Sequence, residues 1–153
     1  MAAADADVAA LTAQLGRVPR ADFDVVVRAA DGSPVVVRNA PFTADGTPMP
    51  TRYWLVDPEL TVSVSRLEAA GGVREAQDAV EPDALRAAHA AYAAERDTAI
   101  AASHAGPRPS GGVAGTRVGV KCLHAHYAYF LAGGDDPVGR WVDARIEAAR
   151  AAP

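Results

Sequence analysis

Residues 23–38 read FDVVVRAADGSPVVVR, and this stretch decides the fold class. It contains two valine-rich runs, residues 23–28 and 35–38, on either side of a turn signal at Asp31 and Gly32. Valine favours extended strands, and Asp-Gly between two such runs is typical of a hairpin. We therefore expect an antiparallel hairpin, with residues 51–56 (TRYWLV) adding a third strand.

Helix signals lie on both sides of this sheet. Residues 5–15 place Val8, Leu11 and Leu15 at helical spacing and are followed by Gly16, a typical helix stop. Downstream, an acidic residue followed by proline opens three helices, because Asp is a good N-cap and proline suits the first helical position. These pairs stand at residues 57–58, 81–82 and 136–137. A further helix is expected over residues 120–132, and a brief one over residues 73–80.

These patterns predict an α+β fold, with a small antiparallel sheet of about three strands packed by four to five helices. A length of 153 residues suits one domain. We expect residues 1–20 to form an N-terminal helix and lead-in, residues 21–56 the sheet, and residues 57–153 the helical part. Aromatic residues make up only 6% of the chain, so the core should hold few large side chains. The expected ones are Phe23, Phe42, Trp54, Phe130 and Trp141.

Composition excludes several classes of protein. The net charge of −4 argues against a general nucleic-acid binder. With Cys122 as the single cysteine, no intramolecular disulfide can form, which fits a reducing compartment. No stretch approaches the roughly 20 apolar residues that a membrane span needs. The first residues lack the basic start of a signal peptide, so a cytoplasmic location is expected.

The densest polar cluster is residues 121–127 (KCLHAHY). One cysteine and two histidines suggest a transition metal, with zinc as the cofactor such ligands favour. On a helix, Cys122 and His126 are four residues apart and can share a metal, with His89 and an acidic side chain as the candidates for further ligands from elsewhere. On a strand, Cys122, His124 and His126 would share one face. The alternative is that Cys122 is a small buried hydrophobe and the histidines are hydrogen-bonded polar residues.

A local basic segment precedes this cluster. No Asp or Glu occurs from Thr98 to Gly134, whereas Arg117, Lys121 and several glycines lie there, just before an expected helix start. Free amides at a helix N-terminus, together with nearby cations, form an anion site suited to phosphate or carboxylate. The alternative is a flexible surface loop with solvated charges.

A polar stripe on the helix that starts at residue 82 adds to this expectation. His89, Tyr92 and Arg96 have helical spacing and can face the helix near Val120. The alternative is a partly exposed face on which Glu95 and Asp97 neutralise Arg96. The predicted ligand-binding residues are therefore Lys121, His124, Arg117, His89, Tyr92 and Arg96. The leading hypothesis is a binding protein for an anionic small molecule at the start of the helix near Val120. Two alternatives stay open: a metal-assisted or histidine-based hydrolase-like enzyme, and a non-catalytic partner of the cell-division machinery. The sequence does not decide whether the protein is an enzyme.

Several segments together resemble the actinobacterial domain-of-unknown-function family 501. The matching segments are Gln14-Leu15-Gly16-Arg17, Pro19-Arg20, Asp45-Gly46-Thr47-Pro48, Pro50-Thr51, Tyr53, Ser65-Arg66-Leu67-Glu68-Ala69, His89, Tyr92, Glu95-Arg96-Asp97, Val120-Lys121-Cys122-Leu123-His124, Pro137 and Gly139. The Lys-Cys-Leu-His block is the most specific of them. The resemblance implies no established activity. Genes for such proteins typically stand beside those for a septum-formation initiator and an exopolyphosphatase, which suggests division or polyphosphate biology. Family members often carry a cysteine near the first hairpin where this chain has Ala29, so a metal site here would lack that ligand.

Overall fold

The computed structural model describes residues 3–153 and confirms the α+β class. Its elements in chain order are α1 (Asp5–Leu15), β1 (Phe23–Arg28), β2 (Pro34–Asn39), β3 (Tyr53–Leu55), α2 (Pro58–Ala69), α3 (Gly72–Ala79), α4 (Pro82–Thr98), the 3₁₀ turn η1 (Val113–Gly115), α5 (Leu123–Leu131) and α6 (Pro137–Ala151). These residues form six α-helices, and the brief helix expected over residues 73–80 is α3. None of these helices has the length and apolar character needed to cross a bilayer.

The hairpin forms as its sequence predicts. The sheet has the antiparallel order β1-β2-β3, and Val25 pairs with Val37 across the hairpin. The Asp31 carboxylate accepts hydrogen bonds from the backbone N–H and the hydroxyl of Ser33. Gly32 has a φ of 87°, a left-handed conformation that favours glycine. The turn residues therefore close the hairpin through their own chemistry.

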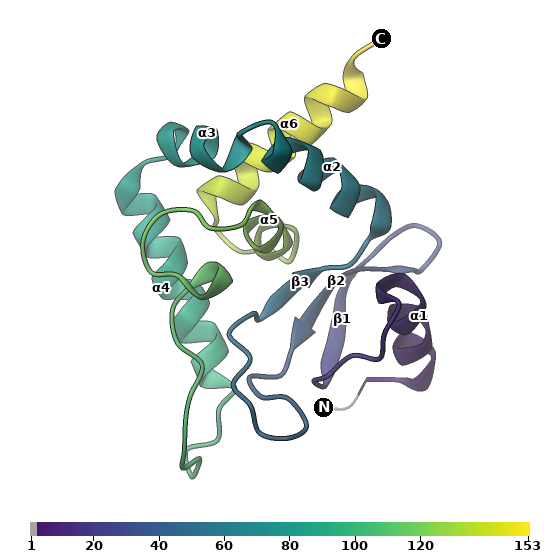
Figure 1. Cartoon of the computed structure of the whole chain (residues 1–153), viewed down its shortest axis with the longest axis vertical. Coiled ribbons are helices and arrows are strands. Elements are labelled where there is room, and N and C mark those ends of the chain that lie inside the picture. Colours follow the sequence, from purple (N-terminus) through teal and green to yellow (C-terminus); the bar gives the residue numbers. More distant parts are fainter. Residues whose placement is uncertain (1–2) are drawn as a thin grey trace.

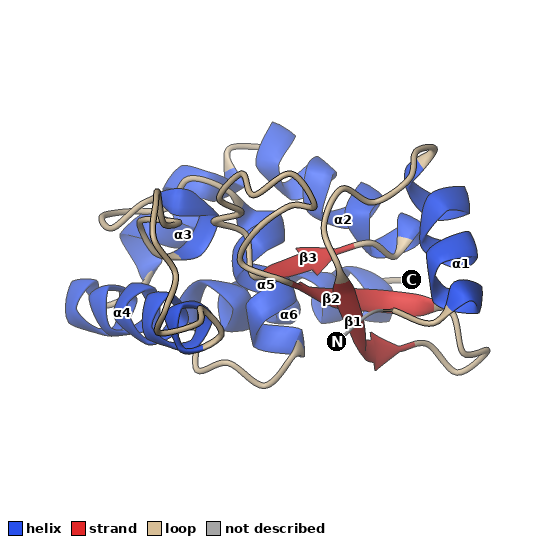
Figure 2. Cartoon of the chain, turned by 90° about the horizontal axis from the view of Figure 1, so that it is seen from below, coloured by secondary structure: helices blue, strands red, loops and turns tan. Residues whose placement is uncertain are grey.

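The sheet lies between two helical layers of unequal size (Figures 1 and 2). On one face, Val37 packs with Leu11 of α1 in a small cluster. On the other face, Val36 joins a large core formed mainly by the later helices. Because β2 is covered on both faces, its valines are buried almost continuously rather than alternately.

Helix α5 occupies the centre of the larger layer, between β3, α2 and α6 (Figure 1). It begins at Leu123 and not near Val120 as predicted. The Val120 amide donates to Gln77 of α3 at 2.8 Å, and the Leu123 amide donates to Glu68 of α2 at 2.8 Å. Residues 120–122 are therefore held in non-helical conformations by side chains from distant segments.

Tyrosines, rather than tryptophans, are the large aromatic residues of the main core. Tyr53, Tyr92 and Tyr129 are buried and lie with ring centroids 5.1–6.1 Å apart. Among the expected aromatic residues, Phe23 is buried, whereas the others are only partly buried. The prediction is confirmed for Phe23 but missed the tyrosines, because a tyrosine can be buried when its hydroxyl finds a partner. The Tyr92 hydroxyl accepts backbone hydrogen bonds at the start of β3, from Arg52 at 2.6 Å and Tyr53 at 3.2 Å.

At Gly139, α6 packs tightly against α5. A Cβ atom at this position would lie 2.3 Å from the Phe130 Cβ and 2.6 Å from the His126 carbonyl oxygen. We expect Gly139→Ala to lower the free energy of unfolding by about 1–3 kcal/mol, as overpacked cores do. Urea denaturation measures this change. Helix propensity alone would raise stability by about 1 kcal/mol, so an unchanged or increased midpoint would contradict the close packing.

Candidate functional site

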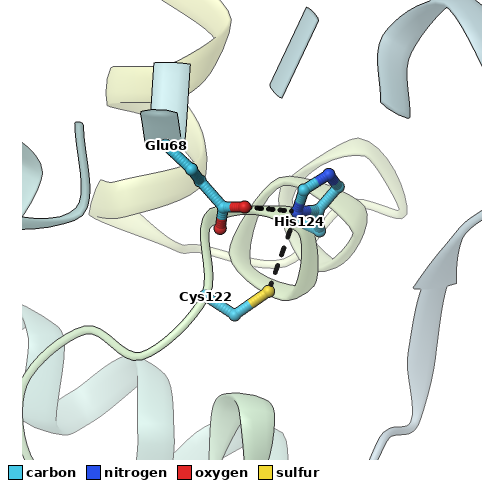
Figure 3. A group of neighbouring side chains, drawn as sticks. All are labelled: Glu68, Cys122 and His124. Atoms are coloured by element: carbon cyan, nitrogen blue, oxygen red, sulfur yellow. Dashed lines mark hydrogen bonds and ion pairs between the residues drawn. The ribbon is translucent and has the colours of Figure 1, made fainter. Parts of the chain in front are cut away.

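Glu68, Cys122 and His124 form a compact cluster of potential ligands (Figure 3). One ligand atom from each residue lies within 4.8 Å of the other two. The His124 Nδ1 atom lies 3.0 Å from a Glu68 carboxylate oxygen and 3.9 Å from the Cys122 sulfur. All three side chains are half-buried, so the cluster can be reached from solvent.

Two helices position this cluster. Glu68 comes from the last turns of α2, and Cys122 is the N-cap residue of α5. One Glu68 oxygen faces His124, and the other accepts the Leu123 N–H at 2.8 Å. The carboxylate is therefore fixed by the start of α5, where the positive end of the helix dipole favours negative groups.

The other ring nitrogen of His124 fixes its protonation. Nε2 lies 3.2 Å from the Thr61 carbonyl oxygen and 3.2 Å from the Ser65 hydroxyl. A carbonyl oxygen only accepts hydrogen bonds, so Nε2 carries a proton and donates. In the neutral ring, Nδ1 then presents a lone pair toward both the thiol and the carboxylate.

The surroundings of this nitrogen favour a positive charge on the ring. The contact with the Cys122 thiol and the charge of Glu68 raise the pKa of His124 above its ordinary value, although burial opposes them. Without a positive charge, the Nδ1 lone pair of His124 would lie against the Glu68 carboxylate oxygen, and the two would repel each other. A proton or a metal ion on Nδ1 removes this repulsion. The arrangement therefore suits either an imidazolium–carboxylate pair or metal coordination.

Comparison with known protein families identifies the family of this chain. Residues 25–144 match a family described as a protein of unknown function, DUF501. The chain belongs to this family. The match includes Glu68, Cys122 and His124, so the whole cluster lies inside the DUF501 domain. Searches among curated proteins and among solved structures found no match.

Within this DUF501 chain, the histidine predicted to join Cys122 has a different partner. His126 is fully buried, and its Nδ1 lies 2.6 Å from Asp136. Cys122 instead contacts His124. Because α5 begins at Leu123, Cys122 lies outside the helix and does not share a helical face with His126. The expected pairing of Cys122 with His126 is corrected accordingly. Glu68 was not among the predicted ligands, because no local pattern links it to a segment so distant in sequence.

Two of the amides near the start of α5 already have partners. Gln77 accepts the Val120 N–H, and Glu68 accepts the Leu123 N–H. The start of α5 thus holds a carboxylate from the chain itself. An external anion near Val120 would therefore lack these two donors.

The six predicted ligand-binding residues separate into different environments. His89, Arg96 and Arg117 line one hollow beside α4, whereas His124 belongs to the cluster with Cys122. The remaining two do not join that hollow: Tyr92 is buried against β3, and Lys121 is exposed.

His89 holds the 113–119 segment against α4 at two points. Its Nδ1 accepts the Val113 N–H at 3.1 Å, and its Nε2 therefore carries the proton and donates to the Gly119 carbonyl at 2.8 Å. The ring can accept one of these hydrogen bonds and donate the other only when it is neutral. Burial lowers the pKa of His89, in agreement with this state.

We expect His89 to make stability depend on pH. The unfolded chain takes up a proton near pH 6.5, before the folded chain does, so the free energy of unfolding should fall as the pH drops below about 6.5. Urea denaturation between neutral and mildly acidic pH measures this slope, with His89→Gln as the non-titrating comparison. His126 and Asp136, which lie near the ring, are present in both proteins. Equal slopes for the two would contradict a neutral His89.

Proposed function

We propose that this protein binds a zinc-type metal ion through Glu68, Cys122 and His124. One observation carries the proposal: the Nδ1 atom of His124 faces both the thiol and the carboxylate, while Nε2 donates to a backbone carbonyl. Metal-binding histidines commonly have this arrangement, because a hydrogen bond from the second nitrogen fixes the tautomer and the ring orientation.

The spacing of the three ligand atoms supports this assignment. Tetrahedral zinc with ordinary bond lengths separates nitrogen from oxygen by about 3.4 Å and nitrogen from sulfur by about 3.6 Å. The corresponding distances here are 3.0 Å and 3.9 Å. For these two pairs, shifts of a few tenths of an ångström would give the tetrahedral separations, and the sulfur and the carboxylate oxygen lie within 4.8 Å of each other.

The ligand count favours a reactive site over a purely structural one. Structural zinc sites have four protein ligands, whereas catalytic sites have three and keep one position for water or substrate. Among residues 3–153, the group contains three members. A zinc ion held this way would lower the pKa of a bound water and polarise a substrate oxygen, as in metal-assisted hydrolysis.

A cysteine-nucleophile mechanism fits the geometry less well. In a thiol–histidine–carboxylate relay, the thiol and the carboxylate contact opposite ring nitrogens. Here Cys122 and Glu68 contact the same nitrogen of His124. The opposite nitrogen faces Thr61 and Ser65, so no relay connects the carboxylate to the thiol through the ring.

Metal titration of the purified protein tests the proposal. In reducing buffer at neutral pH, we expect one equivalent of zinc to bind in competition with a chromophoric chelator. Cobalt should bind at the same site and give the near-ultraviolet absorption of a cobalt–thiolate bond. Failure of both ions to bind at micromolar concentrations would refute the proposal.

A further inference from the structure

A hollow lies on the side of α4 that faces the loop between α4 and α5. The loop runs alongside the helix (Figure 1) and leaves a hollow of about 490 Å³ between them. None of the three proposed metal ligands lines it. The wall residues that carry the argument are Arg86, Ala90, Ala93, Arg96, Pro109 and Arg117.

The hollow is positively charged within an acidic protein. Three arginines line it against a single carboxylate, that of Asp97. Arg86 pairs with Asp83, whereas Arg117 has no acidic partner within residues 3–153. Since the chain as a whole carries a charge of −4, this concentration of cations is local.

Arg96 provides a fixed charge in the wall. Its side chain is only 1% exposed, and Nη1 donates to the carbonyls of Gly111 at 2.9 Å and Pro50 at 3.3 Å. These two carbonyls are neutral, so they orient the guanidinium without cancelling its charge. Arg96 Nε also donates to Asp97 at 3.1 Å, and this carboxylate, which is about half exposed, offsets part of the charge of Arg96. A buried and oriented guanidinium attracts an anion more strongly than a surface arginine does, because less water screens it.

Close packing and hydrogen bonds hold the loop side of the hollow in place. Gly112 lies so close to His89 that a Cβ atom would be 2.6 Å from the His89 Cβ. Its N–H donates to Thr116 at 2.7 Å, and the next amide, that of Val113, donates to His89. Binding an anion would therefore require little ordering of the loop, which favours affinity.

We propose that this hollow binds a small organic oxyanion. The anionic group lies against Arg96 and Arg117, and the apolar part of the ligand covers Ala90, Ala93 and Pro109. Arginine forks match the planar or tetrahedral oxygens of carboxylate and phosphate. The alanines leave space for an apolar body, and most of the accessible wall is apolar.

Calorimetry with phenyl phosphate as probe tests this site. We expect binding with a Kd of about 1 mM or tighter, and weaker binding at higher salt. Phenol, which lacks the charge, should not bind. Arg117→Met should weaken phenyl phosphate binding about tenfold through loss of a charge-assisted contact. As a matched control, Arg140→Met on α6, where Arg140 pairs with Asp135, should leave affinity unchanged.

Three outcomes would overturn the proposal: no binding of phenyl phosphate at about 10 mM, equal binding of phenol, or unchanged affinity in Arg117→Met. The experiment is run with a metal chelator present and repeated with Cys122→Ser. Because the hollow contains none of the proposed metal ligands, binding should persist under both conditions. If the metal proposal failed, phenyl phosphate binding would be unaffected. If phenyl phosphate did not bind, the metal proposal would be unaffected.

Discussion

Replacing Cys122 by serine is expected to weaken zinc binding by about 100-fold or more. The thiolate is the softest of the three ligands, and a hydroxyl does not replace it as an anionic donor to zinc. His124→Gln should have a comparable effect, because it removes the nitrogen that lies between Glu68 and Cys122. Competition titration with a chromophoric chelator measures both affinities.

Graded controls separate coordination from general damage. Ser65→Ala removes a hydroxyl 3.2 Å from His124 Nε2 but leaves the Thr61 carbonyl in place, so we expect a loss of tenfold or less. His104→Gln changes a histidine outside the cluster, one that contacts the Pro107 carbonyl, and should leave zinc affinity unchanged. Wild-type affinity in Cys122→Ser would show that the sulfur is not a ligand.

Asp136→Ala is expected to cause the largest loss of stability, about 3–5 kcal/mol in the free energy of unfolding. Asp136 is fully buried, and one of its oxygens lies 2.6 Å from His126 Nδ1. The other oxygen caps α6 by accepting the N–H groups of Val138 and Gly139. Truncation leaves three buried donors without an acceptor. Urea denaturation followed by circular dichroism measures the loss.

Two variants resolve this effect into its parts. Asp136→Asn keeps an oxygen that can cap α6 but places an amide against His126, so an intermediate loss is expected. Asp135→Ala removes the adjacent carboxylate, which is exposed and pairs with Arg140, and should produce no measurable change. If Asp136→Ala and Asp135→Ala were equally stable, the buried pair would not stabilise the fold.

The parts of the fold that were predictable depend on local chemistry. The hairpin turn at Asp31 and Gly32 and the Asp-Pro helix starts each act within a few residues. The start of α5 was misplaced because its position depends on side chains from α2 and α3, to which Val120 and Leu123 donate. Contacts between distant segments leave no trace in local periodicity.

In the candidate site too, local sequence features were predictable and contacts between distant segments were not. Cysteine and histidine in residues 121–127 indicated the segment that carries two members of the cluster, but not which histidine accompanies Cys122. That choice depends on the non-helical backbone at the cysteine, with a φ of −149°. Glu68 comes from another helix, and its contribution becomes visible only when α2 packs against α5.

The central position of α5 bears on how the chain folds during its synthesis. The strands leave the ribosome well before α5, yet α5 covers the face that carries Val36 and Leu55. Such non-local packing slows folding and leaves apolar surface open until the covering element arrives. We expect nascent chains that end before Leu123 to aggregate or to recruit chaperones. Chains that include α5 and α6 should do neither.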